Sequence, residues 1–83
     1  MERVEIAKGL RDILVDSFGV KEDSITPATK LSTHLGLDSL QIIDCANIVE
    51  GRFNIQLPNC GLERTETFED AVNYLYSQIN GGK

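Results

Sequence analysis

The chain has few of the residue types that build metal and redox centres. Its 83 residues include one histidine, two cysteines and no tryptophan. His34 has no cysteine or carboxylate near it at the spacing of metal ligands, and Cys45 and Cys60 are separated by fourteen residues rather than by two. These patterns disfavour a metal site. We expect Cys45 to be a buried apolar residue of its helix, with a Cys45–Cys60 disulfide as the minor alternative.

Long hydrophobic runs and excess positive charge are also absent. No stretch is long and apolar enough for a transmembrane helix, and charges interrupt the first ten residues, where a signal peptide has its apolar region. We therefore expect a cytoplasmic protein without stable membrane insertion. Eight Lys and Arg against thirteen Asp and Glu give a net charge of -5. This balance disfavours nucleic acid and favours a partner with a basic surface.

Helical periodicity is what the chain does have. With 41% hydrophobic residues, positions 1–83 are predicted to form a single domain with one small core. Apolar residues recur at helical spacing over 3–18, 39–52 and 68–79, and more weakly over 61–66. Gly19 is placed to end the first helix, and Thr67 with Asp70 to cap the last. The predicted fold is all-α: a small four-helix bundle of three main helices plus one short helix.

A long loop over 19–38 connects the first two helices in this prediction. Loops of this length are uncommon in compact domains unless something holds them in place. Evenly spaced aliphatic residues supply the candidates, and we expect Val20, Ile25, Leu31 and Leu35 to insert between the helices.

Leu35-Gly36-Leu37-Asp38-Ser39-Leu40 is the stretch that indicates a function. Asp38 is a good N-cap for the second helix, and Gln41 completes a capping box three residues later. Ser39 then lies in the first turn, where free backbone N–H groups and the helix dipole favour an attached phosphate. By this pattern Ser39 is exposed and lacks the partners of a catalytic nucleophile, so we interpret it as an attachment point.

These residues carry a resemblance to a known family. Asp38-Ser39-Leu40 after Leu35-Gly36 resembles the D-S-L signature of acyl carrier proteins, and the likeness covers nearly the whole chain. Its other landmarks are Phe18-Gly19-Val20, Phe53, Leu57-Pro58 and Thr67-Phe68. The resemblance implies that Ser39 carries 4'-phosphopantetheine, taken from coenzyme A, with Asp38 and Leu40 beside it. It also implies a monomeric, non-catalytic carrier that a phosphopantetheinyl transferase loads, and that presents acyl thioesters to fatty-acid, polyketide or related biosynthetic enzymes.

The resemblance also implies a partner interface along the second helix. Its residues would be Asp38, Leu40, Ile43, Asp44, Asn47 and Glu50. The acyl-loading and acyl-processing enzymes that bind there are expected to have basic surfaces. One departure is that Gln41, Asn47, Gly51 and Arg52 occupy positions that are often acidic or hydrophobic in fatty-acid carriers. A specialised carrier is therefore at least as well supported as the main fatty-acid carrier.

Three other interpretations remain. A peptidyl or D-alanyl carrier would share the fold, but peptidyl carriers usually have glycine, histidine or another residue in place of Asp38. A helical adaptor domain that is never modified would explain Ser39 as an ordinary first-turn residue. A hydrolase of the G-D-S-L type would use Ser39 as nucleophile, which requires a base and an oxyanion hole. His34 is the only histidine, and the chain is far too short for such a fold.

Overall fold

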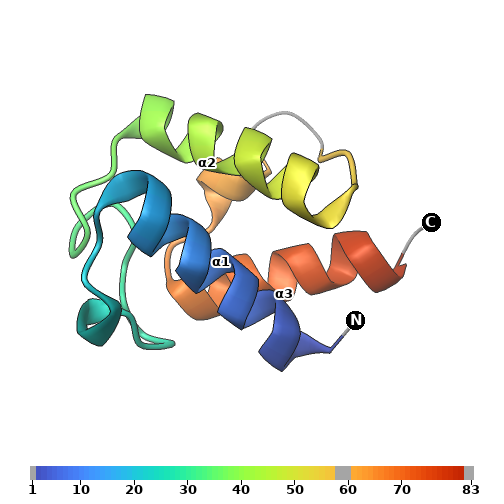
Figure 1. Cartoon of the computed structure of the whole chain (residues 1–83), viewed down its shortest axis with the longest axis horizontal. Helices are drawn as coiled ribbons and strands as arrows, with labels where there is room; N and C mark the ends of the chain where they lie inside the picture. Colours follow the sequence, from blue (N-terminus) through green and yellow to red (C-terminus); the bar gives the residue numbers. More distant parts are fainter. Residues whose placement is uncertain (1, 58–60, 82–83) are drawn as a thin grey trace.

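Three α-helices form the structure, a computed structural model that describes residues 2–57 and 61–81. They are α1 (Arg3–Phe18), α2 (Ser39–Phe53) and α3 (Phe68–Tyr76), shown in Figure 1. Two 3₁₀ turns, η1 (Glu22–Ser24) and η2 (Leu62–Arg64), precede α2 and α3, and a π-helical turn, η3 (Ser77–Gly81), follows α3. β-Pairing within the described ranges is limited to one isolated antiparallel bridge, between Lys30 and Thr67. The mostly helical fold predicted from the sequence is confirmed.

The short fourth helix expected over 61–66 is a single 3₁₀ turn in the structure. Both the backbone N–H and the hydroxyl of Thr65 donate to the carbonyl oxygen of Leu62, at 3.2 Å and 2.6 Å. These bonds close the turn at Leu62–Arg64, so a second helical turn does not follow. Leu62 is buried, and η2 packs against α2. The predicted three main helices are confirmed, and the short fourth element is present as a 3₁₀ turn rather than as an α-helix over 61–66.

The helix ends follow the capping chemistry of the sequence. Gly19 ends α1 with a left-handed φ of 68°, and Thr67 Oγ1 accepts the Asp70 N–H at 3.1 Å at the start of α3. Asn54 ends α2 with a φ of 57°, a cap that the sequence analysis did not assign. Asparagine tolerates this conformation better than most residues, which is the signal that was available.

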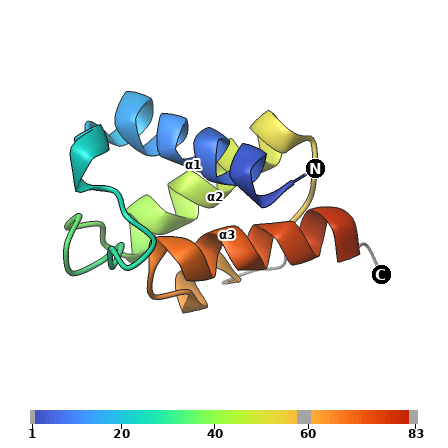
Figure 2. The ribbon, with the colours of Figure 1, turned by 90° about the horizontal axis from the view of Figure 1, so that it is seen from below.

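The core lies where the three helices meet. Helix α1 contacts both α2 and α3. Figure 1 shows α1 between the other two helices in projection, and Figure 2 shows α1 and α3 on opposite sides of the molecule with α2 behind α1. The buried hydrophobic residues come from all three helices, the long loop and η2: Ile6, Leu10, Ile13, Leu14, Ile25, Leu31, Leu37, Ile42, Cys45, Val49, Leu62, Phe68, Ala71, Val72 and Leu75. Cys45 is a free, buried cysteine, as predicted, and Cys60 lies outside the described residues.

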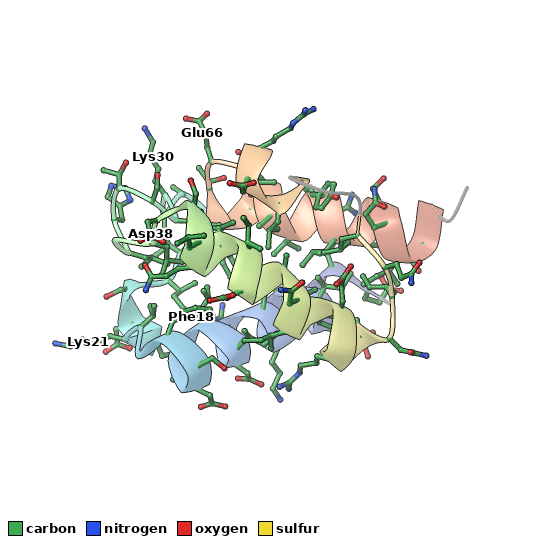
Figure 3. All side chains as sticks on the ribbon, turned by 90° about the horizontal axis from the view of Figure 1, so that it is seen from above. Phe18, Lys21, Lys30, Asp38 and Glu66 are labelled. Atoms are coloured by element: carbon green, nitrogen blue, oxygen red, sulfur yellow. The ribbon has the colours of Figure 1, made fainter. Side chains whose placement is uncertain are left out.

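The long loop is fastened to the start of α3. Ile25 and Leu31 are buried, and Val20 and Leu35 pack against the core, which confirms the four predicted anchors. Backbone bonds then join the two segments: Leu31 N–H donates to Glu66 O at 3.0 Å, and Phe68 N–H donates to Thr29 O at 2.8 Å. Lys30 and Glu66 lie at this junction in Figure 3. The loop therefore has a fixed path toward α2.

Candidate functional site

Ser39 is the first residue of α2 and is exposed. Asp38 is the N-cap: its Oδ1 accepts the Gln41 N–H at 2.9 Å, and Gln41 Oε1 accepts the Asp38 N–H at 3.1 Å. The capping box predicted from the sequence is thus formed in both directions. Because it fixes the backbone on either side of Ser39, the serine has a defined position at the helix end.

The segment before Ser39 explains why the serine faces solvent. Leu37 is only 5% exposed, and its N–H donates to Leu31 O at 3.3 Å. Gly36 has a φ of 71°, a left-handed conformation that favours glycine, and it lets the chain turn into Leu37. With Leu37 held in the core, the next three residues, Asp38, Ser39 and Leu40, are all exposed.

The first turn of α2 also has backbone N–H groups that no described residue accepts a hydrogen bond from. At the start of α3, the N–H groups of Phe68 and Glu69 donate to Thr29 O and Pro27 O, at 2.8 Å and 3.0 Å. No acceptor for the corresponding Ser39 and Leu40 N–H groups exists among the described residues. Free amides at the positive end of a helix dipole favour an anion such as a phosphate ester on the neighbouring hydroxyl.

Groups that would make Ser39 a nucleophile are missing from its surroundings in the described ranges. The Nδ1 atom of His34, the sole histidine, accepts the Lys30 N–H at 2.9 Å, within the loop. Burial raises the pKa of the Cys45 thiol to about 11, so it stays protonated near neutral pH. Residues 2–57 and 61–81 contain no group of three or more metal-ligating side chains.

The residues predicted to form the partner interface are mostly on the solvent side of α2. Leu40 is 72% exposed and Ile43 41% exposed, and Asp44 and Asn47 are also exposed. Ile48, which the prediction of the interface left out, is 37% exposed on the same side. Its position eight residues after Leu40 is the sequence signal that would have included it, since residues at that spacing share one helix face.

Glu50 differs from the other predicted interface residues because it has an internal contact. It is half-buried, and its Oε2 accepts the Leu57 N–H at 2.6 Å, which holds the chain after α2. Burial of the hydroxyl and, as the smaller cause, the charge of Glu50 raise the pKa of Tyr74. The Tyr74 Oη is buried and has no hydrogen-bond partner among residues 2–57 and 61–81. Glu50 therefore helps to hold the segment that follows α2, whatever else it contacts.

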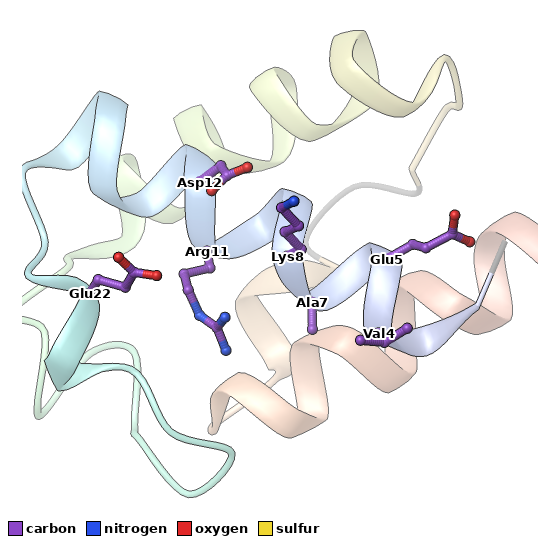
Figure 4. A pocket seen from close by; sticks show the side chains of 7 residues that line it. All are labelled: Val4, Glu5, Ala7, Lys8, Arg11, Asp12 and Glu22. Atoms are coloured by element: carbon purple, nitrogen blue, oxygen red, sulfur yellow. The ribbon is translucent and has the colours of Figure 1, made fainter.

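Two surface hollows lie along α1 rather than beside Ser39. One of about 330 Å³ has charged residues of both signs around Val4 and Ala7 (Figure 4). The other, of about 520 Å³, lies over Gly9 and Phe53, near the Arg52–Asp12 ion pair. Ser39 is in neither lining, so the exposed end of α2 remains the candidate site.

Comparisons with known proteins, by sequence and by fold, both find acyl carrier proteins. The family model described as "Phosphopantetheine attachment site" matches residues 8–75. An acyl carrier protein of Chlorobium phaeobacteroides is 33% identical over 75 residues, which is 90% of this chain and 96% of the relative. That of Chlorobium phaeovibrioides is 35% identical over the same shares. A solved structure of the acyl carrier protein from Enterococcus faecalis superposes with a TM-score of 0.75 at 24% identity, covering 94% of this chain and 99% of that one.

Proposed function

The chain belongs to the acyl carrier protein family, whose cofactor is 4'-phosphopantetheine, and we propose that Ser39 is the residue that bears it. The observation that carries the proposal is the exposed Ser39 hydroxyl at the capped start of α2. The matched segment of the family includes this position.

The surroundings of Ser39 fit a phosphodiester. The free N–H groups of Ser39 and Leu40 can donate to phosphate oxygens, and the positive end of the α2 dipole lowers the energy of the negative charge. Asp38 brings a negative charge to the same turn, but its Oδ1 is directed to the Gln41 N–H by the capping box. The capping box therefore fixes the backbone next to Ser39 before any phosphate is attached.

Loading is a phosphoryl transfer to the Ser39 hydroxyl. Ser39 Oγ forms a bond to the phosphorus of coenzyme A that bears the pantetheine, and the phosphoanhydride bond breaks to release adenosine 3',5'-bisphosphate. The hydroxyl proton goes to a base on the transferase. When bound, the group supplies a terminal thiol that holds acyl chains as thioesters on a flexible arm. Tethering raises the effective concentration of the acyl group at each enzyme that the carrier meets.

The proposal also covers the protein's lack of catalytic activity, its oligomeric state, its partners and its location in the cell. We propose a non-catalytic monomer that serves a phosphopantetheinyl transferase and acyl-processing enzymes in the cytoplasm, as the family membership suggests. None of the helices in residues 2–57 and 61–81 combines the length and apolar character needed to cross a membrane. The interface on α2 is proposed to include Asp38, Leu40, Ile43, Asp44 and Asn47, with Glu50 at its far end.

The proposal is tested by weighing the intact protein after loading. The purified chain is incubated with coenzyme A, magnesium and a broad-specificity phosphopantetheinyl transferase. The expected result is a mass gain of one phosphopantetheine that is abolished in Ser39→Ala and retained in Ser32→Ala, which removes an exposed serine from the preceding turn. No mass gain, or a gain that persists in Ser39→Ala, would contradict it.

A further inference from the structure

His34 satisfies both backbone polar groups of Lys30. The His34 N–H donates to Lys30 O at 2.9 Å, and His34 Nδ1 accepts the Lys30 N–H, also at 2.9 Å. Leu35 N–H donates to the same Lys30 oxygen at 3.3 Å. These bonds close the turn that begins at Lys30, and a side chain rather than the backbone supplies the acceptor for its first N–H group.

The bridge to the start of α3 leaves the Lys30 N–H dependent on this imidazole. In the antiparallel bridge between Lys30 and Thr67, the hydrogen bonds across the bridge are made by the residues on either side of Lys30. The N–H and C=O of the bridged residue itself then point away from the partner segment. No backbone carbonyl of the described residues accepts the Lys30 N–H, so its acceptor there is His34 Nδ1.

The same turn sets the path of the chain into Ser39. Leu37 N–H donates to Leu31 O at 3.3 Å, and Leu31 directly follows the residue that His34 holds. Leu31 and Leu37 are 4% and 5% exposed, so both ends of this bond are anchored in the core. Leu37 is two residues before Ser39. The closed turn therefore fixes the backbone on the loop side of Ser39, as the capping box does on the helix side.

The contact between His34 and Lys30 requires a neutral imidazole. An Nδ1 atom that accepts a hydrogen bond carries no proton, so the ring proton is on Nε2. A second proton would convert Nδ1 into a donor that faces the Lys30 N–H, and the hydrogen bond would be lost. Histidine is the side chain that ordinarily changes its charge between about pH 5 and about pH 8.

The charged side chains of the segments that meet at this turn do not pair with His34. Lys30, Asp38 and Glu66 lie at this end of the molecule in Figure 3. The charged residues of segments 29–38 and 64–70 are Lys30, Asp38, Arg64, Glu66, Glu69 and Asp70. None of them forms an ion pair with His34 within the described ranges. The hydrogen bond to the Lys30 N–H is thus the interaction that protonation of the ring would change.

We propose that neutral His34 is a positioning residue for Ser39, and that protonation of its ring lowers the efficiency with which the Ser39 hydroxyl is loaded. The inference rests on the proposed modification of Ser39. Without the bond to Lys30 the turn loosens, and the bond between Leu31 and Leu37 no longer fixes the entry to α2. A transferase must bring Ser39 Oγ to the phosphorus of coenzyme A in one geometry, so a small displacement of the hydroxyl costs rate.

The test replaces His34 with an acceptor that does not titrate. In His34→Asn, Oδ1 is as many bonds from Cα as His Nδ1 is, and it accepts at any pH. The kcat/KM for loading is measured from about pH 5.5 to about pH 8 with saturating coenzyme A. At each pH the value for wild type is divided by that for His34→Asn, so that titrations of the transferase itself cancel. The two proteins are expected to be about equal at the upper pH, and wild type to be about threefold slower at the lower pH.

Two further variants separate the acceptor from the fold. His34→Ala, which has no acceptor, is expected to be about threefold slower than His34→Asn at every pH. Thr33→Asn changes the exposed neighbouring residue and is expected to keep the pH profile of wild type. Thermal melting shows whether each variant is folded.

The amide signal of Lys30 in NMR spectra gives a readout that does not involve the transferase. In wild type its chemical shift is expected to titrate together with the His34 ring. In His34→Asn it is expected to stay constant over the same pH range.

The outcomes separate this inference from the proposed function. If Ser39 is loaded but the ratio of wild type to His34→Asn does not change with pH, the positioning role is wrong while the attachment site stands. A Lys30 amide that does not respond when the His34 ring titrates would also overturn the role. If wild type gains no mass at any pH, the attachment site itself is wrong.

Discussion

Ser39 and Cys45 lie on the same helix, but only the serine is exposed. Ser39 is at the start of α2 and faces solvent, whereas Cys45 is 3% exposed and packs in the core. Sequence periodicity was enough to separate them, because Cys45 belongs to the same apolar stripe as Ile42 and Val49. Periodicity could not show that Glu50 is tied to the Leu57 N–H, since that bond depends on the path of the chain after the helix.

The buried thiol of Cys45 gives a pH-dependent stability at alkaline pH. Burial raises its pKa from 9.0 to about 11, so the folded protein retains a proton that the unfolded chain loses above pH 9. The stabilisation is fully present below pH 9 and is lost as the pH rises toward 11. We expect the free energy of unfolding of wild type relative to Cys45→Ala to fall by about 2–3 kcal/mol over this range.

The measurement is urea unfolding of wild type and Cys45→Ala at several pH values. Tyr74, whose pKa is also raised, is present in both proteins and therefore cancels in the difference. A difference in unfolding free energy that stays constant from pH 8 to pH 11, values chosen around the pKa of the thiol, would show that the thiolate is not excluded from the core.

At the scale of elements, the contact between α1 and α2 depends on a residue that local propensity disfavours. Gly9 is buried in the middle of α1, and a Cβ there would come within 2.5 Å of Phe53 Cζ. From the sequence alone, a glycine inside a helix indicates only a lower helix propensity. The structure supplies the reason, because the ring of the last residue of α2 occupies the space that a side chain at Gly9 would need.

Two glycine substitutions separate packing from helix propensity. Gly9→Ala is expected to lower the free energy of unfolding by about 1 kcal/mol or more, because displacing Phe53 outweighs the gain in propensity. Gly51→Ala is the matched control on the exposed side of α2, where a Cβ meets nothing within 4 Å. It is expected to stabilise the protein by about 0.5–1 kcal/mol. Urea unfolding measures both.

The role of the Phe53 ring is checked in a second background. In Phe53→Leu, Gly9→Ala is expected to lose its destabilising effect, because the clash with the ring is gone. If Gly9→Ala stabilises the wild-type protein as much as Gly51→Ala does, the close approach of the two helices has no energetic consequence.

At the scale of the whole molecule, the long loop joins the attachment site to α3. The sequence predicted which aliphatic residues anchor the loop, because their spacing is regular and they are apolar. It did not predict the Lys30–Thr67 bridge, since this depends on segments nearly forty residues apart meeting in space. It also did not predict the hydrogen bonds of the Thr29 side chain to Ser24 and Thr26, because these depend on the exact turn that the loop makes. Arg3 joins the start of α1 to α3. Its Cζ lies 4.0 Å from the centroid of the Tyr76 ring, and its Nε donates to Asn73 Oδ1 at 2.9 Å.

Thr29 is the side chain that fixes the loop. It is 5% exposed, its Oγ1 donates to Ser24 O at 2.9 Å, and the same oxygen accepts the Thr26 N–H at 2.8 Å. Thr29→Val keeps the shape of the side chain but leaves both backbone groups without a partner. The expected loss in free energy of unfolding is about 1–3 kcal/mol.

Thr33→Val is the control for the Thr29 substitution, because Thr33 is exposed in the same loop. It is expected to change the free energy of unfolding by less than about 0.5 kcal/mol. Equal effects of the two variants in urea unfolding would mean that the Thr29 network does not hold the loop.

The central claim is that the exposed serine at the start of α2 bears the cofactor, and peptide mass spectrometry of the loaded protein tests it most directly. Cleavage after Lys30 and Arg52 releases one peptide that contains both Ser32 and Ser39. Fragment ions of this peptide are predicted to place phosphopantetheine on Ser39 and to leave Ser32 unmodified. Phosphopantetheine on Ser32 or on any other residue of the chain, with Ser39 bare, would contradict the account.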